Sequence, residues 1–470
     1  MAEFTNKKIA VLGLGIEGQD ICKFLIKHRA KNITLFDQKT PKELGDTYQN
    51  FKFQISNFKL GPDYLKGGLT DFDMIFRSPA LKLSLPEIAE AKKKGSIVTS
   101  ATKLFFDLCP AKIIGVTGTK GKGTTATLIY NILRDYTSVT AKYKILKKAG
   151  LPANRRGKKV FLAGNIGQPM LGLLSQLEGE SWVVLELSSF QLQDLDKSPH
   201  IAVVLFITSE HLDYHRNVKE YTQAKSNIVQ HQKGSDWAVL NADNPLSKSF
   251  CLLTKAKVHF FSRQQKTNGA YIRNDQIFLR EKLIGKTSQL RLKGEHNWDN
   301  VCAAITASAL AGAKMTTIKK VIFSFSGLEH RLELVRHLKG VDFYNDSFST
   351  TPETAIAAIK AFKKPIILIA GGSEKGSDYT QLGQEITKNS VRTLILIGQM
   401  AERIKKAVEK ANFKGEIVYQ PREMKEIIEI AFEKSRRGDV ILLSPACASF
   451  DMFANYKERG RQFKKYAHSL

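Results

Sequence analysis

Apolar, β-branched runs alternate with amphipathic stretches along nearly the whole chain, and this alternation restricts the possible fold more than any other feature. Amphipathic segments such as Thr124–Arg134 and Ile356–Ala361 are predicted to be helices. Strands that alternate with helices form parallel sheets covered by helices, so we expect an α/β protein. The clearest predicted strands are Ile9–Leu12, Ile33–Phe36, Ile113–Val116, Trp182–Leu187, Ala202–Ile207, Ile366–Ala370, Leu394–Ile397 and Val440–Leu443.

The length and one irregular interval determine the predicted domain organisation. A chain of 470 residues corresponds to about three domains, at roughly 150 residues per domain. We predict a Rossmann-like N-terminal domain over 1–100, a central P-loop-type ATPase domain over 101–326 and a Rossmann-like C-terminal domain over 327–470. Short strands with turn signals between Val258 and Leu292 predict a small antiparallel sheet beside the parallel sheet of the central domain.

The composition argues against several classes of protein. The 72 lysines and arginines against 45 aspartates and glutamates give a formal net charge of +27, which favours anionic partners. A nucleic-acid-binding protein is one alternative, but no zinc finger or aromatic RNA-binding motif accompanies the scattered basic residues, so we expect no nucleic acid partner. The 5 cysteines are far apart, which indicates a reducing compartment. No apolar run approaches the ~20 residues of a membrane span. We expect a cytoplasmic monomer.

A glycine-rich loop stands between an apolar strand and an amphipathic helix. Its sequence is Gly115-Val-Thr-Gly-Thr-Lys-Gly-Lys-Gly-Thr-Thr125. Glycines allow backbone N–H groups to turn toward phosphates, and the helix N-terminus adds positive partial charge. Lys122 can then reach the β- and γ-phosphates, and a following hydroxyl can bind Mg²⁺. Because Gly123 stands where a strict P-loop has its hydroxyl residue, Thr124 and Thr125 are alternatives, and we favour Thr124.

Further short motifs follow this loop along the chain. They are Gly164-Asn-Ile-Gly167, Glu186-Leu-Ser-Ser-Phe-Gln-Leu192, Thr208-Ser-Glu-His-Leu-Asp213, Tyr221-Thr-Gln-Ala-Lys225, Gly294-Glu-His-Asn-Trp-Asp-Asn300, Gly327-Leu-Glu-His-Arg331, Asn345-Asp-Ser347, Gly371-Gly-Ser-Glu-Lys375 and Ser444-Pro-Ala-Cys-Ala-Ser-Phe-Asp451. Together with the loop these motifs resemble those of the Mur ligase family, although the Gly-Lys-Gly-Thr ending is closer to the related folylpolyglutamate synthases. Within the family, the ELSSFQL and SPACAS segments are similar to members that add D-glutamate to UDP-N-acetylmuramoyl-L-alanine in peptidoglycan precursor synthesis.

The resemblance implies an ATP-dependent ligase that makes an acyl phosphate, which the amine of an amino acid then attacks. ATP and a carboxylate are both anions, so Mg²⁺ and cationic side chains must neutralise their charge. By resemblance, the catalytic residues are Lys122, Glu186, His211 and Lys225. Two Mg²⁺ ions are expected, held by Thr124, Glu186, His211 and Lys225. An ammonium cannot bind a metal ion, so Lys225 is expected to be carbamylated.

The resemblance also implies that two parts of the chain bind ATP. Asn297 and Asn300 are spaced to share one helix face, near the adenine and ribose. Arg331 is expected to reach the γ-phosphate, and Asp346 the ribose or a Mg²⁺-linked network. Phe348 stands where many relatives have a lysine. The full set of expected ATP-binding residues is Gly118, Thr119, Lys120, Gly121, Lys122, Gly123, Thr124, Asn297, Asn300, Arg331 and Asp346.

A second glycine motif lies near the N-terminus. Gly13-Leu-Gly-Ile-Glu-Gly18 follows a predicted strand, and Asp37 ends the next one. Taken alone, this pattern is typical of dinucleotide binding and supports an alternative, an NAD-dependent oxidoreductase. The family resemblance implies instead that this region binds the UDP part of the substrate. The expected UDP-substrate residues are Gly15, Asp37, Ser78, Asn165 and Gln191.

The amino-acid substrate is expected to bind to the C-terminal domain. D-Glutamate carries two carboxylates, so its site needs cationic and hydroxyl donors. By resemblance these are Thr350, Lys375 and Ser449, together with the backbone near Tyr456. Another Mur ligase, or a folylpolyglutamate synthase, is the alternative that these motifs leave open.

Overall fold

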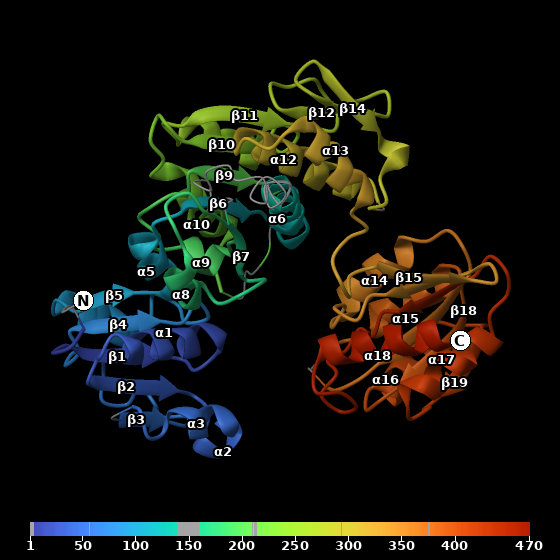
Figure 1. The fold of residues 1–470 in the computed structure, drawn as a ribbon. Helices are drawn as coiled ribbons and strands as arrows, with labels where there is room; N and C mark the ends of the chain where they lie inside the picture. Colours follow the sequence, from blue (N-terminus) through green and yellow to red (C-terminus); the bar gives the residue numbers. More distant parts are fainter. Residues whose placement is uncertain are drawn as a thin grey trace, which may run out of the picture. The chain divides into compact units, whose positions relative to one another are not determined.

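The computed structural model describes residues 4–55, 57–138, 159–208, 210, 214–292, 294–374 and 377–470. The chain divides into two compact units (Figure 1). The first unit comprises Met1–Leu290 with Glu295–Ser324, and the second comprises Arg291–Gly294 with Phe325–Leu470. Both units are built on parallel strands connected by helices, which confirms the predicted α/β class.

The first sheet of the first unit is parallel, with its 5 strands in the order β3-β2-β1-β4-β5. The chain order reverses between β1 and β4, so the loops after these two strands meet at the carboxyl edge of the sheet. The elements are β1 (Lys8–Leu12), α1 (Ile16–Lys27), β2 (Asn32–Asp37), α2 (Pro41–Leu44), α3 (Asp46–Phe51), β3 (Asn57–Leu60), β4 (Met74–Arg77), α4 (Pro86–Lys93) and β5 (Ile97–Thr99).

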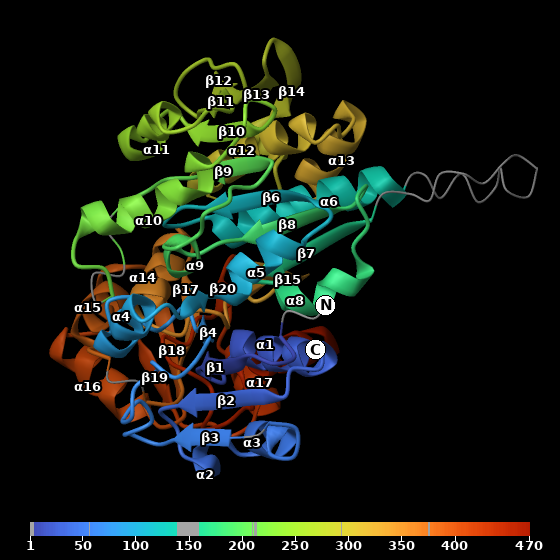
Figure 2. The ribbon, with the colours of Figure 1, turned by 90° about the vertical axis from the view of Figure 1, so that its left-hand side faces the viewer.

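The second sheet of this unit has 6 parallel strands in the order β11-β10-β9-β6-β8-β7 (Figure 2). Its inner strands are fully buried, as their uninterrupted apolar runs predict. The strands are β6 (Lys112–Thr117), β7 (Val160–Gly164), β8 (Trp182–Glu186), β9 (Ile201–Val204), β10 (Trp237–Asn241) and β11 (Lys257–Phe261).

Helices α6, α12 and α13 pack against one another beside this second sheet (Figure 1). The helices of this part are α5 (Ala101–Leu108), α6 (Lys122–Ser138), α8 (Met170–Leu173), α9 (Ser189–Leu192), α10 (Val218–Gln230), α11 (Pro245–Ser249), α12 (His296–Leu310) and α13 (Met315–Ser324). The 3-stranded antiparallel sheet contains β12 (Ala270–Arg273), β13 (Gln276–Leu279) and β14 (Lys282–Lys286).

This antiparallel sheet was predicted, but its predicted start was wrong. Val258 lies in β11, which pairs in parallel with β10 and belongs to the large sheet. The basic segment Lys142–Lys159 falls almost wholly outside the described residues. Among the helices in the described part of the chain, none is long and apolar enough to cross a membrane.

The second unit contains a 6-stranded sheet in the order β15-β16-β20-β17-β18-β19, in which only the β15–β16 pair is antiparallel. Helices cover both faces of this sheet and form one buried apolar cluster with each face. The elements are β15 (Glu333–Leu338), β16 (Val341–Asn345), α14 (Pro352–Lys360), β17 (Ile366–Gly371), α15 (Thr380–Lys388), β18 (Val391–Ile397), α16 (Ala401–Lys410), β19 (Glu416–Tyr419), α17 (Met424–Glu433), β20 (Val440–Leu443) and α18 (Tyr456–Ser469).

Candidate ligase site

The glycine loop connects the end of β6 to the start of α6, as the sequence predicts. Gly118 has φ 151° and Gly121 has φ 87°, a backbone region that favours glycine. A Cβ on Gly118 would lie 2.7 Å from the Cβ of Leu205, and one on Gly121 would lie 2.1 Å from Oδ1 of Asn300. Only glycine therefore fits at either position. The tight loop opens directly into a helix N-terminus, which is a natural phosphate cradle.

Two lysines converge on this loop. Lys122 Nζ donates to the carbonyl oxygens of Gly118 at 3.0 Å and Thr119 at 2.8 Å. Lys225, on α10, is only 1% exposed, and its Nζ donates to the same Gly118 oxygen at 2.9 Å. Burial, and then the charge of Lys122, lowers the pKa of Lys225 well below its usual value, although nearby glutamates oppose the shift. The neutral amine that this environment favours is the form that reacts with carbon dioxide to give a carbamate.

Glu186 lies one strand away from the loop. It is the last residue of β8, is paired with Val116 of β6, and is 8% exposed. An oxygen ligand at this edge of the sheet suits Mg²⁺, so Glu186 and a carbamate on Lys225 fit the implied metal. His211 lies outside the described residues. In the described part of the chain, no group of 3 or more His, Cys, Asp and Glu side chains is arranged to hold a metal ion.

Two asparagines face the loop from α12. The Nδ2 of Asn300 donates to Oδ1 of Asn297 at 2.8 Å, which confirms that the two side chains share one helix face. The hydroxyl of Thr125 donates to Oδ1 of Asn300 at 3.2 Å. Thr125 is thus hydrogen-bonded to α12, whereas Thr124 lies one residue nearer the loop and is 6% exposed. Thr124 stays the predicted Mg²⁺ ligand.

Asp37 is hydrogen-bonded to the N-terminal glycine motif. Its carboxylate accepts hydrogen bonds from the backbone N–H groups of Leu14 at 2.6 Å and Lys39 at 2.9 Å. The loop after β4 also reaches this motif, since a Cβ on Gly13 would lie 3.1 Å from the Cβ of Ser78. The loops after β1, β2 and β4 therefore gather at one end of the first sheet. Gly15 lies there too, as the N-cap of α1.

Gln191 connects that loop cluster to the second sheet. Its side chain is 1% exposed, and its Nε2 donates to Oε1 of Glu17 at 2.6 Å. Its Oε1 accepts from the backbone N–H of Ser188 at 3.0 Å. Burial raises the pKa of Glu17, and the hydrogen bond from Gln191 opposes that effect. Glu17 was not predicted to be a site residue, although it stands inside the GxGxxG motif. Asn165 lies beside β8, because its N–H donates to the Glu186 carbonyl at 3.1 Å.

In the second unit, Asp346 joins its own motif to Ser444 of the SPACAS motif and to Leu332, which follows the Gly327–Arg331 motif. It follows β16, is 2% exposed, and accepts from the N–H of Leu332 at 3.0 Å and the Ser444 hydroxyl at 2.8 Å. The Ser349 hydroxyl donates to it as well. Burial raises the pKa of Asp346 to about 6, and these hydrogen bonds oppose a larger shift. The loops after β16 and β20 are thereby held together.

Arg331 and Phe348 are in contact beside Asp346. The Arg331 guanidinium lies 4.4 Å from the centre of the Phe348 ring, and the Tyr456 ring stands nearly perpendicular to Phe348 at 5.2 Å. Thr350 is half-buried just before α14, and Ser449 is 2% exposed. Lys375 lies outside the described residues.

Arg459, on α18, is a residue of this region that the sequence analysis missed. It is fully buried, and it donates from Nε to Ser347 Oγ at 3.0 Å and to the carbonyls of Cys447 and Ala448, both at 3.2 Å. It therefore links the loops after β16 and β20. No local motif marks it, because its role depends on contacts with segments far away in the sequence.

Comparisons with known proteins identify the family. Residues 7–100 match the Mur ligase MurD-like N-terminal domain, residues 116–308 the Mur ligase middle domain, and residues 330–447 the Mur ligase glutamate ligase domain. The UDP-N-acetylmuramoylalanine–D-glutamate ligase of Acetivibrio thermocellus is 40% identical, with 99% of this chain and 97% of that protein aligned. The chain belongs to the Mur ligase family. The Mur ligases of the same name from Symbiobacterium thermophilum and Clostridium kluyveri are 39% and 38% identical, over 99% of this chain and 98% and 97% of theirs.

Solved structures of other Mur ligases share the fold. The UDP-N-acetylmuramate-alanine ligase of Thermotoga maritima superposes with a TM-score of 0.57 at 16% identity, covering 99% of this chain and 100% of that one. The MurF ligase of Thermotoga maritima, solved in complex with ADP, gives a TM-score of 0.52 at 16% identity and covers 100% of both chains. At such low identity these structures establish the fold alone. The resemblance predicted from the motifs is confirmed, and with it the three-domain Mur ligase architecture.

Proposed function

We propose that this Mur ligase joins UDP-N-acetylmuramoyl-L-alanine to D-glutamate, with ATP as the energy source, in peptidoglycan precursor synthesis. One observation carries the proposal: along 99% of its length the chain is 40% identical to an enzyme named for this reaction. The glycine loop with its two lysines supplies suitable chemistry. Family membership argues against the NAD-dependent and nucleic-acid-binding alternatives.

The proposed reaction has two steps. A carboxylate oxygen of the L-alanyl group attacks the γ-phosphorus of ATP, the bond to the β-phosphate oxygen breaks, and ADP leaves. The uncharged amine of D-glutamate then attacks the acyl carbon, the carbon–oxygen bond to phosphate breaks, and the nitrogen loses a proton as the amide forms. Lys122 neutralises charge on the transferring phosphoryl group. The expected contacts of ATP are those of the loop Gly118–Thr124, Asn297, Asn300, Arg331 and Asp346.

Bound Mg²⁺ would act as a Lewis acid that neutralises the phosphate oxygens. Thr124, Glu186, His211 and carbamylated Lys225 would hold two such ions. The burial of Lys225 and its lowered pKa support carbamylation, because only an uncharged amine can form the carbamate.

The first sheet is proposed to be a Rossmann-like domain, over 1–100, that binds the UDP moiety. Its strand order, β3-β2-β1-β4-β5, supports this, since ligands of such sheets bind where the order reverses. Gly15, Asp37 and Ser78 would line that site, and Asn165 and Gln191 would extend it toward the ligase centre. The central domain would cover 101–326.

D-Glutamate is proposed to bind to a Rossmann-like C-terminal domain over 327–470. Thr350, Lys375, Ser449 and the backbone near Tyr456 would contact it, at the end of the sheet where the loops after β16 and β20 meet. The monomeric state and the cytoplasmic location remain predictions from the sequence.

An ADP-release assay tests the function. Purified protein with Mg-ATP and UDP-N-acetylmuramoyl-L-alanine receives D-glutamate, L-glutamate, L-lysine or meso-diaminopimelate, and products are resolved by mass and chirality. We expect D-glutamate to give the dominant product and Lys122→Ala to lose orders of magnitude in rate. Another dominant product would refute the specificity, and near-normal turnover by Lys122→Ala would refute the assigned site.

A further inference from the structure

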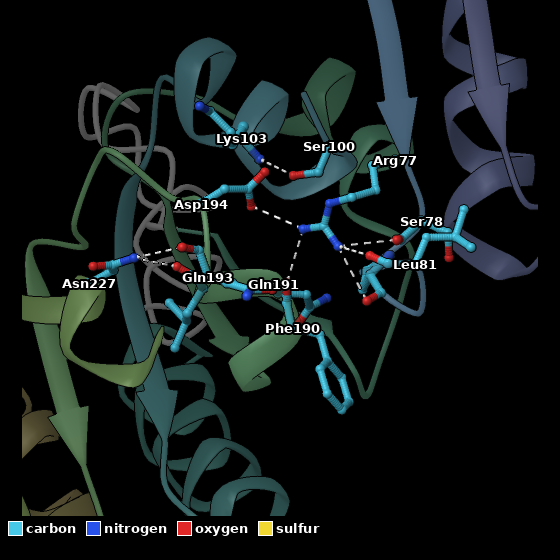
Figure 3. A network of polar contacts seen from close by, with 12 residues as sticks. Arg77, Ser78, Leu81, Ser100, Lys103, Phe190, Gln191, Gln193, Asp194 and Asn227 are labelled. Carbon is cyan, nitrogen blue, oxygen red and sulfur yellow. Dashed lines mark hydrogen bonds and ion pairs between the residues drawn. The ribbon is translucent and has the colours of Figure 1, made fainter. Parts of the chain in front are cut away.

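Arg77, the last residue of β4, is a fully buried arginine whose contacts join two parts of the first unit. Its Nη1 donates to carbonyl oxygens of the loop that follows its own strand, those of Ser78 and Pro79 at 3.3 Å and Leu81 at 2.8 Å. Figure 3 shows the guanidinium between this loop and Asp194. The side chain therefore shapes the loop in which Ser78 is proposed to contact the UDP substrate.

The same guanidinium binds the segment around α9, beside the second sheet. Its Nη2 donates to the carbonyl oxygen of Phe190 at 3.2 Å and to Oδ1 of Asp194 at 3.1 Å (Figure 3). Its Nη1 also donates to the Tyr214 hydroxyl at 3.4 Å. Phe190 directly precedes Gln191, so one planar cation spans from the loop after β4 to the ELSSFQL segment.

A buried arginine needs compensating partners, because an isolated charge in the protein interior is costly. Here one carboxylate and a set of carbonyl oxygens provide them. The geometry is specific to arginine, since its rigid fork can point toward several acceptors at once, whereas a lysine ammonium is a compact point charge. The hydrogen bond between Gln191 and Glu17 forms a second tie between the same two regions.

We propose that Arg77 is a positioning residue that aligns the UDP-binding loops of the first sheet with the ligase centre beside α9. This inference rests on the proposed function. The UDP-linked substrate must reach from the loops after β1 and β4 to the glycine loop, so its productive binding depends on that alignment. ATP binds to the glycine loop and does not depend on it. Arg77 thus affects the productive binding of the UDP-linked substrate, and not that of ATP or D-glutamate.

Asp194→Asn is the mildest test, because it weakens the contact with the segment that follows α9 while Arg77 keeps the carbonyl contacts of its own loop. We expect the KM for UDP-N-acetylmuramoyl-L-alanine to rise about tenfold, equivalent to about 1.4 kcal/mol. The KM for ATP and for D-glutamate should change less than about twofold, and calorimetric binding of UDP alone should be equally unaffected. Arg77→Met should cause a larger rise in the same KM, and Arg77→Lys an intermediate one, because it restores the charge without the fork.

Asp196→Asn is the matched control. Asp196 pairs with Lys103 at 2.9 Å in the same region, but the Asp196 side chain is 61% exposed, whereas that of Asp194 is 15% exposed. This variant should retain wild-type kinetics, as most exposed ion pairs contribute little. Circular dichroism melting of every variant reports on stability separately from the kinetic constants.

The outcomes separate the two proposals. A wild-type protein that makes no D-glutamyl product overturns the proposed function and this inference with it. If the wild type is active, three results overturn the inference alone: unchanged kinetics in Asp194→Asn, equal effects of Asp194→Asn and Asp196→Asn, or parallel rises in the KM for all three substrates. A selective rise for the UDP substrate supports it.

Discussion

Gly121→Ala is expected to weaken ATP binding while leaving the fold intact. Gly121 has φ 87°, and an added Cβ would lie 2.1 Å from Oδ1 of Asn300. Asn300 is 5% exposed and bonded to both Thr125 and Asn297, so it cannot move aside freely. The loop itself must therefore change its conformation, and this loop is proposed to bind the phosphates of ATP.

The size of the effect follows from these contacts. Keeping the loop unchanged would displace Asn300 and lose its two hydrogen bonds, which contribute about 0.5–1.5 kcal/mol each. The variant must therefore give up roughly 1–3 kcal/mol to keep the wild-type loop, and at about 1.4 kcal/mol per tenfold change the KM for ATP should rise about 5- to 140-fold.

Gly312→Ala is the control for backbone strain. Gly312 has φ 93° just beyond the end of α12, but nothing lies within 4 Å of its added Cβ. It should lose about 1–2 kcal/mol of stability without a change in the KM for ATP. Thermal melting and ADP-release kinetics on both variants make the comparison. A KM for ATP within about twofold of wild type in Gly121→Ala, or an equal rise in Gly312→Ala, would refute the reasoning.

Two further predictions concern other parts of the site. Lys225→Ala should be nearly inactive, and a short carboxylic acid that fills the vacated space should restore part of the activity by supplying the missing carboxylate-like ligand. No rescue at any concentration, together with a high-resolution map of the wild type with nucleotide and Mg²⁺ bound that shows a free ammonium, would contradict carbamylation. Phe348→Ala should raise the KM for ATP several-fold, since cation–π contacts contribute about 0.5–2 kcal/mol and the Arg331 guanidinium stacks on that ring. Phe348→Leu, which keeps the apolar bulk without the ring, is its control, and equal kinetics in the two variants would show that the ring face does not matter.

The local parts of the fold and site could be predicted from the sequence. Apolar β-branched runs located the buried strands, and the glycine spacing located the loop between β6 and α6, because both depend on neighbouring residues in the chain. The shared face of Asn297 and Asn300 follows from helix periodicity in the same way. The boundary at Val258 failed, since the sequence of an edge strand does not show whether its partner runs parallel or antiparallel.

The amino-acid sequence thus determined the α/β class, the phosphate-binding loop and the Mur ligase resemblance. Each of these depends on short segments of neighbouring residues. Only the tertiary structure placed Lys225 against the carbonyl of Gly118, 107 residues away, and so gave its amine a lowered pKa. It also revealed the contacts of Arg77 and Arg459 with carbonyl oxygens of distant segments. Backbone carbonyls are the same for every residue type, so no sequence pattern predicts which ones a buried arginine will bind.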